Sequence, residues 1–177
     1  MPTLVFDTGP LGHFARAHRL DVLRVIAAGR AVVIPRPVVE ELRRGAHLHR
    51  DIGAVLDADW IEHRNIQSDA EAESFGKYAV RLVSGDRNVG EAAVLALAET
   101  IRATAVVDDA VAHRLAKRSG VSCIRTLALL VDAARLGALT LDDVSDLADS
   151  LIATEYRLPF GPADFAKWAT EKNLFTQ

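Results

Sequence analysis

The 177-residue chain has one cysteine, no long hydrophobic run and no excess of positive charge. A single thiol, Cys123, cannot form an intramolecular disulfide, and it is expected to be a small buried residue in a reducing, cytoplasmic setting. The longest apolar runs, such as residues 127–131, are far too short to cross a bilayer, and the first residues lack the features of a signal peptide. We therefore expect a cytoplasmic protein without a membrane partner.

The net charge and the absence of several motifs exclude further classes of protein. With 21 Lys and Arg against 24 Asp and Glu, the net charge of −3 is not that of a strongly basic nucleic-acid binder, so any RNA contact must be local. The sequence contains no glycine-rich phosphate loop of the form GxxxxGK[ST]. It also offers no Ser-His-Asp or Cys-His nucleophilic set and no His/Cys spacing typical of zinc.

Short apolar runs alternate with longer segments of helical periodicity along the chain, a pattern that predicts a three-layer α/β/α sandwich with a central, mainly parallel sheet. The expected strands are 3–6, 31–34, 104–107 and 122–124, with a weaker one at 60–63. The expected helices are 9–17, 19–28, 37–44, 69–82, 90–101, 109–119, 126–136, 141–152 and 162–172. Gly120 and Gly137 are placed as C-terminal helix caps. We expect residues 1–137 to form the core and residues 138–177 a helical extension packed on the same domain.

Acidic residues follow two of the expected strands. Asp7 comes directly after residues 4–6, and Asp108 and Asp109 come directly after residues 105–107. Because ligands gather at the carboxyl ends of parallel strands, these acids are expected at one edge of the sheet. Taken singly, Asp7 and Asp109 could equally be helix N-caps, where aspartate is favoured.

Two further positions supply acids to the same centre. Glu91 begins a helix of small and apolar residues, where it would also benefit from the helix dipole. Glu40 and Glu41 follow the second strand; one of them should face inward, and helical periodicity does not decide which. Three or four converging carboxylates require a counter-charge, and oxygen ligands select Mg²⁺ or Mn²⁺. Such an ion suits phosphodiester hydrolysis.

The ordered combination of these motifs resembles the PIN-domain family, which includes the toxin nucleases of VapBC toxin-antitoxin pairs. The matching segments are Asp7-Thr8-Gly9-Pro10-Leu11, residues 34–42, residues 90–98 and Val106-Val107-Asp108-Asp109. The resemblance implies a PIN-like fold, with Asp7, Glu41, Glu91 and Asp109 as metal ligands and catalytic acids and Asp108 as an alternative to Asp109. It further implies Mg²⁺- or Mn²⁺-dependent cleavage of RNA, a homodimer and, for the toxins, an antitoxin partner.

One departure from the family pattern concerns Val107, which stands where the family commonly has a threonine or serine two positions before its fourth acid. Val107 cannot donate a hydroxyl hydrogen bond to support that acid. This departure and the weak overall basicity motivate an alternative function, a catalytically silent PIN scaffold that binds RNA or protein. Arg43, Arg44, His47, His49 and Arg50 form a basic cluster that either contacts RNA or is a solvated surface loop.

Overall fold

The computed structural model describes residues 2–175 and contains one five-stranded sheet with the strand order β3-β2-β1-β4-β5. The strands are β1 (Thr3–Phe6), β2 (Ala31–Pro35), β3 (Ile61–Arg64), β4 (Thr104–Val106) and β5 (Cys123–Ile124). All neighbouring strands are parallel. The central strands β1, β2 and β4 are almost wholly buried, as expected for apolar strands covered on both faces. The predicted three-layer sandwich with a parallel sheet is confirmed.

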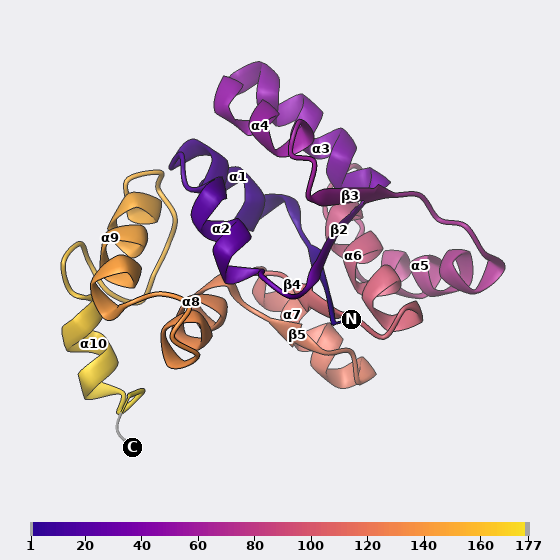
Figure 1. Cartoon of the computed structure of the whole chain (residues 1–177). Coiled ribbons are helices and arrows are strands. Elements are labelled where there is room, and N and C mark those ends of the chain that lie inside the picture. Colours follow the sequence, from indigo (N-terminus) through magenta and orange to yellow (C-terminus); the bar gives the residue numbers. More distant parts are fainter. Residues whose placement is uncertain (1, 176–177) are drawn as a thin grey trace.

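Helices cover both faces of the sheet (Figure 1). They are α1 (Thr8–Arg16), α2 (Leu20–Ile26), α3 (Arg36–Leu48), α4 (Gly53–Leu56), α5 (Asp69–Leu82), α6 (Val89–Thr100), α7 (Ala110–Ser119), α8 (Thr126–Arg135), α9 (Leu141–Ile152) and α10 (Phe165–Glu171). Helix α6 packs across β1, β2 and β4 and contacts α5 and α7, while α1, α2 and α8 lie on the opposite face. Among the described residues, no helix is long and apolar enough to span a membrane.

Helix α6 is the central helix because its side chains are small and apolar on every side. Residues 92–98 are all buried, which is the property of a helix surrounded by protein rather than of one with a solvent face. Glycines end two other helices as predicted: Gly120 directly after α7 and Gly137 two residues after α8 adopt the left-handed conformation, with φ of 73° and 70°.

The interpretation of the basic cluster at residues 43–50 as a loop is wrong. Helix α3 does not end at residue 44 but continues through Gly45 to Leu48, and a 3₁₀ turn follows at Arg50–Ile52. Gly45 lies against Ile52, since an added Cβ would be 3.2 Å from the Ile52 Cδ1. The glycine therefore allows close packing within the helix rather than ending it. Cys123, expected to be buried, is only partly so.

Candidate metal centre

Asp7 lies at the carboxyl end of β1, where the chain turns into α1. Its backbone N–H donates to the carbonyl of Val106 at 3.1 Å, which joins the ends of β1 and β4. Its side chain makes no capping hydrogen bond to α1, and the residue is only 7% exposed. The buried Oδ1 has no hydrogen-bond partner among the described residues. Helix capping therefore does not account for a carboxylate at this position.

Glu41 points from α3 toward the start of α1 and the start of α6. It accepts hydrogen bonds from the Thr8 hydroxyl and, at 3.0 Å, from the backbone N–H of Gly90. A Cβ at Gly90 would lie 2.7 Å from the Glu41 Oε2, so only glycine leaves room for this carboxylate. Its neighbour Glu40 instead pairs with Arg36 at 3.2 Å and Arg43 at 3.6 Å. Of the two glutamates, Glu41 is the one placed beside α1 and α6.

Electrostatics show that these acids share one environment. Burial, followed by the negative charge of Glu91 and then by those of Glu41 and Asp108, raises the pKa of Asp7 well above its ordinary value. Burial, with further contributions from Glu41 and Asp109, also raises the pKa of Glu91. The elements carrying these acids are far apart in sequence, and the fold brings the acids within electrostatic reach of each other.

The two aspartates after β4 have different partners. Asp109 caps α7: its Oδ1 accepts from the backbone N–H groups of Val111 and Ala112, both at 2.8 Å. Asp108 accepts from the backbone N–H and the hydroxyl of Thr126, both at 2.8 Å, and from the Tyr156 hydroxyl at 2.6 Å. The capping role considered for Asp109 is thus present, whereas Asp108 is held by residues from two distant segments.

Sequence reasoning missed Thr126 and Tyr156. Val107 has no hydroxyl that could donate a hydrogen bond to Asp109. Hydroxyl donors are found instead at the neighbouring Asp108, and they come from Thr126 and Tyr156, outside the strand. Tyr156 is itself positioned by His13, whose ring lies 4.9 Å from the tyrosine ring and whose Nδ1 is 2.8 Å from the Thr154 hydroxyl. Thr126 begins a predicted helix, but no local pattern marks Tyr156, which is 48 positions from its partner.

Oxygen donors dominate the site, and they fit a hard cation such as Mg²⁺ or Mn²⁺. The orphaned, buried Oδ1 of Asp7 is the observation that favours such a ligand, because a buried carboxylate oxygen without a partner is costly. Within residues 2–175, no three His, Cys, Asp or Glu side chains are already spaced to hold a metal ion. Glu41 accepts hydrogen bonds from Thr8 and Gly90, and each of its carboxylate oxygens keeps a lone pair with which it could hold a cation.

A surface hollow of about 270 Å³ opens beside Glu41. It is lined by Arg36, Pro37, Glu40, Glu41, Arg44, Asp86 and Val89. The acid that faces α1 and α6 is therefore reached from solvent through a space bordered by arginines. Its lining carries charges of both signs, with Arg36 and Arg44 beside the carboxylates of Glu40, Glu41 and Asp86.

Comparison with known proteins decides the family. A family model described as a PIN domain matches residues 3–161. The chain belongs to the PIN-domain family. This match confirms the resemblance inferred from the sequence motifs, and it extends past residue 137 to include α9.

A solved structure has the same fold as this PIN domain. It is the crystal structure of VapBC2 from Rickettsia felis bound to a DNA fragment from their promoter. The TM-score is 0.51 at 14% sequence identity, and the match covers 70% of this chain and 98% of that one. At this identity the likeness concerns the fold. No curated protein matches the chain.

Proposed function

We propose that this PIN domain is a Mg²⁺- or Mn²⁺-dependent endoribonuclease that hydrolyses RNA phosphodiester bonds. The observation that carries the proposal is Asp7, buried at the end of a central strand with an unpartnered oxygen and with its pKa raised by neighbouring acids. Such a cluster of carboxylates is costly to the metal-free protein, and a divalent cation would remove that cost.

The proposed ligands and catalytic acids are Asp7, Glu41, Glu91 and Asp109, with Asp108 as a further ligand. Glu41 is preferred to Glu40 because Glu40 is engaged by Arg36 and Arg43. Asp108 has three hydrogen bonds that hold its carboxylate in place, whereas Asp109 has one oxygen occupied by its helix cap. The second Asp109 oxygen is left for a ligand in this assignment.

When bound, the divalent cation supplies an activated water and neutralises charge on the phosphate. The residues of the chain perform the remaining tasks. Thr8 and the Gly90 N–H orient Glu41, and Thr126 and Tyr156 orient Asp108. Arg36 and Arg44 border the hollow through which the phosphate reaches Glu41.

We further propose that this nuclease acts in the cytoplasm as the toxin of a toxin-antitoxin pair. The support is the family membership and the fold shared with VapBC2 of Rickettsia felis, which was solved with promoter DNA. In this proposal an antitoxin protein is the partner that blocks the acidic site, and the toxin is a homodimer. Co-expression with the product of a neighbouring short reading frame, followed by co-purification, tests the partnership.

The central test is Asp7→Asn, which keeps the shape of the side chain and removes its charge. We expect Mn²⁺-dependent cleavage of single-stranded RNA to fall on the order of 100-fold or more, because the substituted amide is a poor cation ligand. Asp142→Asn, at an exposed position of α9, is the matched control and should cut at the parent rate. Full activity in a folded Asp7→Asn protein would reject the assigned chemistry.

The alternative is a catalytically silent scaffold, and one observation favours it: no described cluster of three metal-ligating side chains is already in place. Calorimetric titration with Mn²⁺ separates the two functions. Binding that is lost in Asp7→Asn, together with RNA turnover by the parent, supports the nuclease. RNA binding without metal binding or turnover supports the scaffold.

A further inference from the structure

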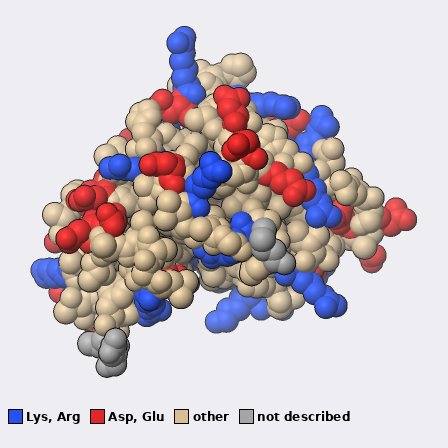
Figure 2. All heavy atoms as spheres, in the orientation of Figure 1, with Lys and Arg blue, Asp and Glu red and all other residues tan. Residues whose placement is uncertain are grey.

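A second hollow, of about 190 Å³, adjoins the one beside Glu41. It is lined by Arg36, Val39, Arg43, His63, Arg64 and Asn65, and Arg36 lines both hollows. None of the described residues that line it is acidic. Charges of both signs are interspersed over the face of the molecule seen in Figure 2. A hollow lined by arginines without an acid is therefore a local feature of a chain that is acidic overall.

The sheet places this basic hollow in line with the acids. Pro35 ends β2 and is paired in register with Arg64, which ends β3, so Arg36 and Arg64 emerge at the edge of the sheet where Asp7 follows β1. The strand order is β3-β2-β1, and β3 and β1 are two strand spacings apart, about 10 Å. Acids at β1 and cations at β2 and β3 thus lie along one edge, close enough for one polynucleotide strand to contact both.

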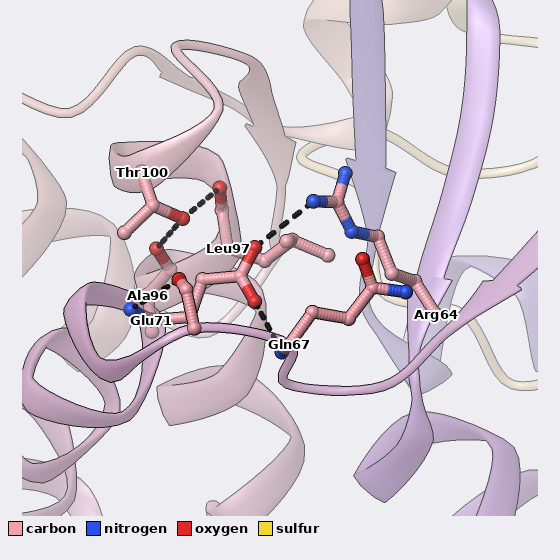
Figure 3. Close-up of polar contacts among 7 residues, drawn as sticks. Arg64, Gln67, Glu71, Ala96, Leu97 and Thr100 are labelled. Atoms are coloured by element: carbon pink, nitrogen blue, oxygen red, sulfur yellow. Dashed lines mark hydrogen bonds and ion pairs between the residues drawn. The ribbon is translucent and has the colours of Figure 1, made fainter.

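Arg64 is held in place by one buried partner, Glu71 (Figure 3). Its terminal nitrogen donates to the Glu71 Oε1 at 2.9 Å, and the second Glu71 oxygen accepts from the Gln67 backbone N–H at 2.6 Å. The other terminal nitrogen points away from Glu71 (Figure 3). The Arg64 Nε is buried and has no hydrogen-bond partner among the described residues. A guanidinium fixed at one terminal nitrogen keeps its second terminal nitrogen to donate to an anion.

The arginines of α3 have few anionic partners. Arg36 and Arg43 share one carboxylate, that of Glu40, and both pairs are largely exposed, so they contribute little stability. Arg44, which follows Arg43 in α3 and lines the first hollow, forms no ion pair or hydrogen bond among the described residues. These guanidinium groups can therefore bind an incoming phosphate at little cost to the fold.

We propose that the hollow lined by Arg36, Arg43, His63 and Arg64 binds the sugar-phosphate backbone of the RNA strand beside the scissile bond. The inference rests on the proposed nuclease function. It adds that the RNA strand extends from the acids toward the ends of β2 and β3. No Phe, Tyr or Trp is among the described residues that line the hollow, so its contacts to phosphates contribute affinity rather than sequence preference.

The test measures binding without cleavage. A fluorescent single-stranded RNA of about 12 nucleotides, within the site sizes of single-strand binders, is titrated with the full-length protein in EDTA, and anisotropy gives the Kd at several salt concentrations. Arg43→Gln should bind about threefold to tenfold more weakly and reduce the salt slope by about 0.7. Arg118→Gln, on α7 beside the opposite edge strand β5, is the control and should match the parent.

Two outcomes would overturn the proposal. One is an unchanged affinity and salt slope in both Arg43→Gln and Arg64→Gln. The other is displacement of the RNA by a polyglutamate peptide as effective as unlabelled RNA, which would assign the hollow to an acidic protein segment. RNA cleavage by the parent with Mn²⁺ is measured separately. Binding that depends on Arg43 without any cleavage rejects only the nuclease, whereas cleavage with binding independent of Arg43 rejects only the hollow.

Discussion

The surroundings of Asp7 disfavour its negative charge on balance, because the hydrogen bond from the Thr8 backbone that stabilises the carboxylate is outweighed. Burial and the neighbouring acids raise its pKa in the folded state. The folded protein then binds more protons than the unfolded chain, so stability falls as the pH rises from the unfolded pKa of about 3.9 through the folded one. Its ionised form at neutral pH is thus a cost to the fold that a bound cation would offset.

This cost predicts that Asp7→Asn is more stable than the parent in EDTA at pH 7, because the amide has no charge to bury. The difference should shrink below about pH 4, where the parent carboxyl is protonated as well. Urea unfolding at both pH values measures it, with Asp142→Asn as an exposed control. A variant less stable than the parent at pH 7 in EDTA would show that Asp7 has a stabilising partner.

Gly90 offers a second prediction at the scale of single residues. Alanine is favoured over glycine in a helix by about 1 kcal/mol, so Gly90→Ala should not lower the melting temperature. The new Cβ would, however, stand 2.7 Å from the Glu41 Oε2 and displace that carboxylate. We expect Mn²⁺ affinity and RNA cleavage to fall about 10- to 100-fold, as when a supporting partner of a metal ligand is lost.

The control for Gly90→Ala is Gly76→Ala in α5, where an added Cβ meets nothing within 4 Å. This variant makes the same chemical change in another helix. It should leave metal binding and cleavage unchanged, as measured by calorimetry and by RNA turnover. Equal losses in both variants would mean that a general effect on the helices, rather than the position of Glu41, reduces activity.

At the scale of helices and strands, the sequence predicted the elements whose signals are local. Strands β1, β2 and β4 were identified from apolar runs that end at a carboxylate or proline, and α6 from its small residues. The end of α3 was not identified correctly, because a glycine such as Gly45 is common just after the last turn of a helix. The reason for a glycine at position 45 is the packing of Ile52, which the 3₁₀ turn at Arg50–Ile52 brings back against the helix.

The residues of the candidate site also fall into those that local sequence signals predict and those that depend on the fold. Asp7 and Glu91 could be found because each stands at the boundary of a predicted element. The choice between Glu40 and Glu41 depended on which side of α3 faces Thr8 and Gly90, and that is a property of helix packing. Tyr156 could not be found, since its contact with Asp108 depends on how the segment after α9 returns to the sheet. Local patterns located the acids, and only the fold shows what holds them.

At the scale of the whole molecule, residues of the segment 138–175 contribute to the same hydrophobic core as the sheet. Val144, Leu147 and Leu151 of α9 and Phe165 of α10 are buried in one continuous cluster with β1, β2 and β4. Tyr156 reaches Asp108, and Thr154 contacts His13 of α1. We propose that the segment 138–175 is an integral part of the domain, so that the chain unfolds in a single transition.

Leu147→Ala tests this unity of the fold. Leu147 is 2% exposed, and truncating a buried leucine costs about 2–5 kcal/mol, which in a chain of this size lowers the melting temperature by roughly 5–15 °C. Because α9 shares its core with the sheet, scanning calorimetry should show the whole transition moving as one peak. Leu141→Ala in the same helix, at a position 43% exposed, should shift it far less. The contrary result is a Leu147→Ala protein with a small early peak and a main peak at the parent temperature, which would show that the C-terminal helices melt independently. In that case the hydrogen bond from Tyr156 to Asp108 would be lost before the sheet unfolds.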